Sequence, residues 1–244
     1  MIKFFRKIRK SMLDQNKTSR YLKYAIGEII LVVIGILIAL SINNWNENRK
    51  SKKVANEIYL NLQNSLVQDS TEVQRIIKSQ SKSLNVQKEL ILNQASQESI
   101  AFEDTNLSQL ISDIGSGVYS FFPKTGIYNS IVSNNSMDLI KSKKVKASLV
   151  NLYDHQYERH AIMDATIENK YHFQLFPVIY KKIGYLQNVD ENPDPLLFKE
   201  HYEELVAECR NVYGILNSNK NLLIQISKDI DVLLQLIRAE LEKN

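Results

Sequence analysis

At 244 residues the chain has room for one or two domains, and its seven Gly and four Pro favour long helices joined by short connections. Its net charge of +4 divides into +9 over residues 1–53 and −5 over residues 54–244. The mildly acidic larger part excludes a nucleic-acid reader, which gathers Lys and Arg on its folded surface. The single cysteine, Cys209, excludes an intrachain disulfide and is expected to be a small core residue.

The N-terminal residues 1–23 are expected to form a basic cytoplasmic tail. Apolar side chains within residues 2–13 recur at helical spacing among Lys and Arg, which predicts a short helix lying in the anionic inner leaflet of a membrane. A frayed basic tail is the alternative. Ser19 is a suitable N-cap for the next helix along the chain.

Residues 24–45 are predicted to form one transmembrane helix. As a helix these 22 residues are roughly 30 Å long, which matches the hydrocarbon thickness of a bilayer. Tyr24 and Trp45 mark its two ends, where aromatic rings favour the headgroup level. Glu28 lies one turn inside. We expect it to snorkel to the interface or to be protonated; a polar contact between two associated helices and a proton-relay role are the alternatives.

The distribution of cations predicts the orientation of this helix. Eight Lys and Arg precede the span and four follow it closely, so the N-terminus is expected in the cytoplasm and residues 46–244 in the periplasm. The protein would then be a single-pass protein of the cell inner membrane. A signal peptide cleaved near Ala39-Leu40-Ser41 is the rival interpretation, but the apolar stretch is long for a signal core. Gly35 and Ala39 form a small-residue pair that would let two such helices approach closely.

Beyond the span, a polar sequence carries a single apolar stripe at steps of four and seven. This pattern predicts a long helix that buries a narrow seam, formed by Val54, Ile58, Leu62, Leu66, Val73, Ile77, Leu84 and Ile91. Nothing between Trp45 and Val54 breaks a helix, which is compatible with one helix running from the span into the domain.

A short apolar helix is expected at residues 107–114, after a polar link at residues 93–104, and Gly115-Ser116-Gly117 should end it. Four aromatic rings then fall within Tyr119–Tyr128, around Pro123 and Gly126. Aromatic residues in a connection either plug the end of a bundle or line a surface that recognises a ligand or partner. We expect a plug and keep the recognition role as the alternative.

Further helices are predicted at residues 142–170 and 173–185, the latter interrupted at Pro177, and after the loop 187–195 at residues 196–216 and 221–243. The last of these has apolar residues at strict steps of three and four, which is typical of a coiled-coil seam. No segment reads as a strand. The predicted fold is therefore all-α: a transmembrane helix followed by an antiparallel bundle of long amphipathic helices, with four main helices.

The sequence contains no convincing motif for a catalytic site or a metal-binding site. His160 with Asp164, and Glu168 with His172, are spaced to share a helix face, but a metal site needs at least three converging ligands. A solvated or hydrogen-bonded face explains them better. The acidic string around Asp190 lacks the glycine and terminal Glu of a calcium-binding loop. We assign no catalytic, cofactor-binding or metal-binding residue, expect no cofactor, and do not expect an enzyme.

The run from Tyr24 to Glu47, YAIGEIILVVIGILIALSINNWNE, resembles the hallmark of a family of bacterial single-pass membrane proteins with a domain of unknown function. The MIKFFRKIR tail matches that family too, and Phe122–Ile131 followed by Met137–Lys141 is similar to its mid-domain block. The resemblance implies the same architecture, makes Glu28 a family feature, and implies no activity.

Two functions remain compatible with these observations. The first is a non-enzymatic accessory subunit that contacts the lipid membrane and forms a homo-oligomer or binds another envelope protein. The second is a periplasmic bundle that senses a ligand and signals through a partner. An exposed apolar stripe along residues 223–241 would favour the first, and an apolar pocket with buried polar groups near Phe121 and Phe122 would favour the second. We expect the accessory role.

Overall fold

The computed structural model describes residues 18–96, 106–186 and 192–243. The helix expected at residues 2–13 and the acidic string at Asp190 and Glu191 lie outside these ranges. Within them 89% of the residues are helical and none is in a strand, which confirms the all-α prediction. The chain divides into two compact units, residues 1–54 and residues 55–244, and each is described by itself.

In the first unit, helix α2 (Thr18–Ser96) begins and carries the apolar run. Over the part of the chain that is described, it is the one helix long and apolar enough to cross a membrane. Its apolar side chains are exposed: Ile29 is 63% exposed and Trp45 65% exposed. Exposure of an uncharged run of this length is what a helix surrounded by lipid requires. A signal sequence meets the same criteria, so cleavage near Ala39 stays an open alternative.

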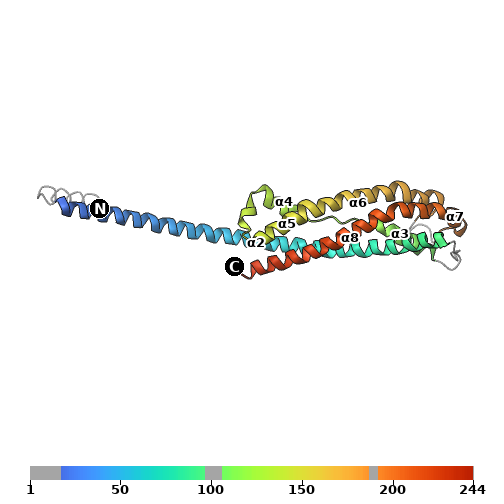
Figure 1. The fold of residues 1–244 in the computed structure, drawn as a ribbon, viewed down its shortest axis with the longest axis horizontal. Coiled ribbons are helices and arrows are strands. Elements are labelled where there is room, and N and C mark those ends of the chain that lie inside the picture. The colour runs from blue at the N-terminus through green and yellow to red at the C-terminus, as the bar shows by residue number, and fades with distance from the viewer. Residues whose placement is uncertain (1–17, 97–105, 187–191, 244) are drawn as a thin grey trace. The chain divides into compact units, whose positions relative to one another are not determined.

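The second unit contains the rest of α2 and a series of shorter and longer helices (Figure 1). In chain order these are α3 (Leu107–Gly115), η1 (Ser116–Val118), α4 (Gly126–Ser133), η2 (Ser136–Leu139), α5 (Lys143–Val150), η3 (Asn151–Tyr157), α6 (Glu158–Lys170), η4 (Tyr171–Leu175), η5 (Val178–Lys182), α7 (Pro195–Glu200) and α8 (Tyr202–Leu241). The 3₁₀ helices are η1 and η2, whereas η3, η4 and η5 are π-helical. We call the helical run from Lys143 to Lys182 the central rod.

Three long helices form the main body of the described part of this unit: α2, the central rod and α8. The α8 helix runs antiparallel to the other two, because Gln74 of α2 pairs with Ser227 while the Leu90 carbonyl accepts a bond from Tyr202. The central rod runs parallel to α2. The sequence suggested four main helices, and there are three among the described residues because the helices expected at residues 196–216 and 221–243 form the single helix α8.

Two breaks that the sequence predicted within helices are absent. The break expected between residues 216 and 221 is absent, and α8 runs through it because Asn-Ser-Asn-Lys contains neither Gly nor Pro. The chain breaks at His201 instead. The central rod also continues through Pro177, which was expected to interrupt it. Pro177 lies between η4 and η5, where the wider π turns relieve the clash that a proline ring makes with the preceding turn.

The interior contains two apolar cores. The first core joins the beginning of the second unit's α2 to α4, η3 and the end of α8, through Leu62, Leu66, Val73, Ile76, Leu149, Leu152, Ile226, Ile230, Leu233 and Ile237. The second core joins the end of α2 to α3, the end of the central rod and the start of α8, through Leu84, Leu90, Ile114, Ile167, Leu175, Leu205, Cys209, Val212 and Leu216. Cys209 is fully buried there, as expected.

The apolar seam of residues 223–241 belongs to the first core. Leu223, Ile226, Ile230, Leu233 and Ile237 are all fully buried inside the bundle. The seam of α2 is more polar than its apolar pattern suggested. Val54 is 43% exposed, and four polar side chains are buried along this helix: Asp69, Gln80, Ser83 and Gln87.

Gly117 occupies a place where no side chain fits. A Cβ atom there would lie 2.7 Å from Ser83 Oγ, 2.9 Å from a methyl carbon of Leu216 and closer still to the Tyr171 hydroxyl. We therefore expect Gly117→Ala to lower the free energy of unfolding by ~1–3 kcal/mol, the usual cost of overpacking.

The measurement is thermal unfolding of the full chain in detergent, followed by near-ultraviolet circular dichroism. Gly214→Ala is the matched control, because nothing lies within 4 Å of a Cβ at this position in α8 and alanine favours a helix. Equal midpoints for the Gly117→Ala variant and the wild type would contradict this account of residue 117.

Candidate functional site

The extended segment at residues 119–125 is fixed to the bundle by a buried carboxylate. Asp69 of α2 is 1% exposed, and it accepts the backbone N–H of Lys124 at 3.0 Å and the Tyr157 hydroxyl at 3.0 Å. Burial raises the pKa of Asp69, while the Lys124 and Tyr157 bonds lower it. The first of these bonds satisfies the Lys124 N–H, which has no helical partner because the segment is extended.

Aromatic rings pack around this attachment. Phe121 meets Tyr157 edge to face at 5.6 Å, and Tyr153 stacks on Tyr128 at 4.4 Å. The Tyr128 hydroxyl donates to Asp154, and burial together with this carboxylate raises the pKa of Tyr128 to about 12. Of the four rings expected to form a plug, Phe121 and Tyr128 are buried, at 2% and 4% exposed, whereas Tyr119 is 50% exposed. Phe122 is 73% exposed.

A group of buried polar side chains lies between the two cores: Gln80 on α2, His160 and Asp164 on α6, and Asn219 on α8. We call this group the polar layer. His160 Nε2 donates to the Phe121 carbonyl at 3.2 Å, and its Nδ1 lies 2.9 Å from Asn219 Oδ1. His160 therefore ties α6 to α8 and to the extended segment. His160 and Asp164 are 1% and 6% exposed, so their shared face is buried rather than solvated.

The second pair that the sequence suggested does not form a site. Glu168 accepts the Ser120 hydroxyl at 3.0 Å, whereas His172 packs on the ring of Phe176. Within the described ranges no group of three or more His, Cys, Asp and Glu side chains could hold a metal ion. His155 is exposed, and His201 lies 3.7 Å from Glu204.

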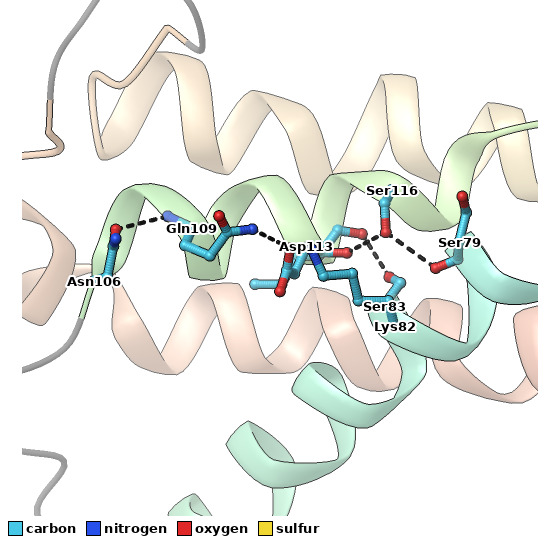
Figure 2. Close-up of polar contacts among 8 residues, drawn as sticks. Ser79, Lys82, Ser83, Asn106, Gln109, Asp113 and Ser116 are labelled. Atoms are coloured by element: carbon cyan, nitrogen blue, oxygen red, sulfur yellow. Dashed lines mark hydrogen bonds and ion pairs between the residues drawn. The ribbon is translucent and has the colours of Figure 1, made fainter.

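Helix α3 is attached to α2 through polar groups along one side (Figure 2). Asn106 caps the helix by accepting the Gln109 N–H at 3.0 Å, and Asp113 lies 2.5 Å from the ammonium of Lys82. At its end, Ser116 donates to the Ser79 carbonyl at 3.0 Å, and Ser83 donates to the Ile114 carbonyl at 2.6 Å.

Tyr171 completes this attachment from the central rod. Its hydroxyl donates to the Ile114 carbonyl at 3.1 Å and accepts from Gln87 at 2.9 Å. Burial raises the pKa of Tyr171. Tyr171 begins η4, and Tyr153 and Tyr157 lie in η3, so these buried phenols all belong to π turns. A π turn inserts an extra residue and rotates the next turns of the helix, which directs these rings inward where an α-helical continuation would direct them differently.

An aromatic surface lies on the outside of η4 and η5. Phe173, Phe176, Pro177 and Tyr180 form what we call the aromatic ridge, in which the rings of Phe176 and Tyr180 stack at 5.3 Å. A shallow groove of about 300 Å³ runs along it, lined by His172, Phe173, Phe176, Pro177, Tyr180 and Lys181. A second groove of about 100 Å³ shares Phe176 and Tyr180 and reaches Tyr119.

The sequence did not single out this ridge. Residues 173–185 were predicted only as an apolar helix interrupted at Pro177, with no exposed face assigned. The available signal was the spacing of Phe173, Phe176 and Tyr180 by three and four residues, which places the three rings on one face. Only the packing decides that this face points outward: Phe173 is 75% exposed and Tyr180 44% exposed.

A protein-family model described as a family of unknown function (DUF6090) matches residues 28–178, more than half of the chain. The match covers most of the predicted span, the extended segment and the central rod up to Val178. Comparison with curated proteins gives no match, and comparison with solved structures gives none either.

The buried carboxyl of Asp164 makes the stability of the bundle depend on pH. Burial raises the pKa of Asp164, the Ser120 hydroxyl and His160 lower it, and Glu168 raises it. A folded-state pKa above the unfolded value of about 3.8 means that the folded protein binds the proton more tightly. The contribution of Asp164 to stability is therefore greatest below about pH 3.8 and is lost as the pH rises through the folded-state pKa.

We expect Asp164→Asn, which cannot ionise, to gain stability relative to the wild type as the pH is raised from about 4 to 7. The check is the thermal midpoint of both proteins across that range. Asp231→Asn, at an exposed position of α8, is the control and should keep a constant offset. An offset for Asp164→Asn that does not change with pH would contradict the assignment.

Proposed function

The chain belongs to the DUF6090 family, and we propose that it is a membrane-anchored, non-enzymatic interaction subunit of the bacterial envelope. In this proposal residues 24–45 hold the chain in the inner membrane, the basic tail lies in the cytoplasm, and the helical bundle lies in the periplasm. The partner is another envelope protein, and it binds the aromatic ridge.

The observation that carries this proposal is the exposure of the ridge. Single exposed apolar residues are ordinary, but contiguous apolar patches mark contact surfaces, and aromatic residues are enriched where proteins bind one another. The rings of Phe176 and Tyr180 stack on each other, so these side chains lose little conformational entropy when a partner binds. Lys181 at the edge of the groove favours a partner with an acidic group there.

A second copy of the chain is a poorer occupant of the ridge. The stripe at residues 223–241, which could have formed an oligomer if exposed, is used inside the bundle. A two-fold contact through the ridge would bring the same surface of each copy together, and the lining of the groove contains no acidic side chain that could pair with Lys181. A cation left without a partner at such a contact weakens it.

The alternative function is a ligand-sensing bundle that signals through a partner. The polar layer favours this alternative, because its buried polar groups lie beside the Phe121 attachment and can form hydrogen bonds to a polar molecule. The described grooves lie elsewhere, on the ridge, and this is why we favour the interaction subunit.

Site-specific photocrosslinking in living cells tests the proposal. A photoreactive phenylalanine analogue would replace Phe173 in the full chain, and in a control chain it would replace Ile162, an isolated apolar residue on α6 that is 71% exposed. We expect position 173 to give one discrete adduct whose partner is the same envelope protein in every preparation, and position 162 to give none.

Tyr180→Ala in the Phe173-labelled chain should reduce the adduct by about tenfold, as loss of one contact-surface aromatic ring does. An adduct of equal strength with this substitution, or equal adducts at positions 173 and 162, would contradict the ridge as the binding surface. An adduct of twice the chain's mass would contradict the other-protein partner and assign the ridge to a homodimer.

A further inference from the structure

The polar layer interrupts an otherwise apolar interior. The first core ends at Ile76 on α2 and at Leu223 on α8, and the second core begins at Leu84 and Leu216. Between these limits Gln80 and Asn219 are both 0% exposed. Buried polar side chains of this kind are retained only where something satisfies their hydrogen bonds.

The pairing of the helices brings the members of the layer to one level. Between α2 and the central rod, Asp69 pairs with Tyr157 and Ser83 pairs with Tyr171. The two residues of each pair are 88 positions apart in the sequence. The same separation places Gln80 opposite residue 168, which is one helical turn from Asp164. The Gln74–Ser227 bond sets Gln80 within about two residues of Asn219 on α8. Helices pack 8–10 Å apart, so side chains pointing inward at one level approach to within a few ångströms.

The polar atoms of this level lack protein partners. Among the residues that are described, neither Gln80 Nε2 nor Gln80 Oε1 has a hydrogen-bond partner, and the same holds for Asp164 Oδ1 and Asn219 Nδ2. Turning the Asn219 amide about its last bond exchanges one unpaired atom for another. With the ring proton of His160 on Nε2, its Nδ1 accepts from Asn219 Nδ2, and the amide oxygen is then the atom without a partner.

We propose that the polar layer binds ordered water, shared among Gln80, Asp164 and Asn219. Either orientation of the Asn219 amide leaves four unpaired atoms, which include both amide donors and oxygen acceptors, and a water molecule supplies two donor hydrogens and two acceptor lone pairs. Buried water typically makes about three hydrogen bonds to groups of this kind. A dry layer would leave all four atoms unpaired, so each would lose its hydrogen bonds to water on folding without gaining a replacement.

The bound water lies between the two apolar cores, within the interior of the second unit. The inference is independent of the proposed function, since it concerns the interior and not the ridge.

The direct test is the nuclear Overhauser effect between water and the side-chain amide protons of Gln80, measured on the full chain in detergent micelles. The resonance is assigned by its loss in Gln80→Leu. We expect a cross-peak from water bound for longer than about a nanosecond at Gln80 and none at the backbone amide of Leu66, which is 0% exposed in the first core. Absence of a cross-peak at Gln80 would overturn the proposal.

The stability of Gln80→Leu gives a second, separate arm. If water joins Gln80 to its neighbours, leucine removes those bonds and the thermal midpoint falls by ~2–4 °C. If the layer is dry, leucine replaces an unpaired amide with an apolar side chain of similar size, and the midpoint rises. A rise would also overturn the proposal.

Gln87→Leu is the matched control for the second arm. Gln87 is likewise 0% exposed, and it lies seven residues further along the same face of α2, where its amide donates directly to Ser83 and Tyr171. Loss of these direct bonds should lower the midpoint, which shows that the measurement responds to a lost buried amide at this face.

Discussion

The attachment of the extended segment to the bundle interior is the constraint on which the rest of this structure depends. Residues 119–125 cross from the second core to the first without helical hydrogen bonds of their own. Asp69 accepts the Lys124 N–H, and His160 donates to the Phe121 carbonyl. Because these bonds fix the crossing, α4 and the start of the central rod are brought to the far end of the first core, and the rod can then run parallel to α2.

The same requirement explains which features the sequence revealed and which it did not. The helix at residues 107–114 and the seam of α8 were predictable, because their apolar residues recur at helical spacing and bury the same face. The burial of Asp69 was not predictable, because a polar residue within an apolar stripe is indistinguishable from a solvent-facing one until its partners are known. Those partners, Lys124 and Tyr157, lie 55 and 88 residues away.

Two further features arise from packing that no local pattern encodes. The π turns at η3 and η4 leave no mark in the apolar periodicity, yet they set the direction of Tyr157 and Tyr171. Pro177 was read as a break, and the helix passes through it. The ridge has the same origin: the aromatic spacing placed three rings on one face, but the position of the rod against α8 turned that face outward. The candidate site was therefore less predictable than the fold.

The bundle thus combines an interior organised by polar attachments with an exterior on which the aromatic ridge is exposed. The ridge can bind another envelope protein only if the bundle lies on the opposite side of the membrane from the basic tail. Reporter fusions that show the compartment of a chosen residue test that condition directly. Alkaline phosphatase and green fluorescent protein would each be fused after Lys53 and after Asn244, and a blot would record the size and location of the product. The account predicts phosphatase activity without fluorescence at both sites, on a full-length membrane-bound chain. Fluorescence without phosphatase activity, or a shortened soluble product, would contradict it.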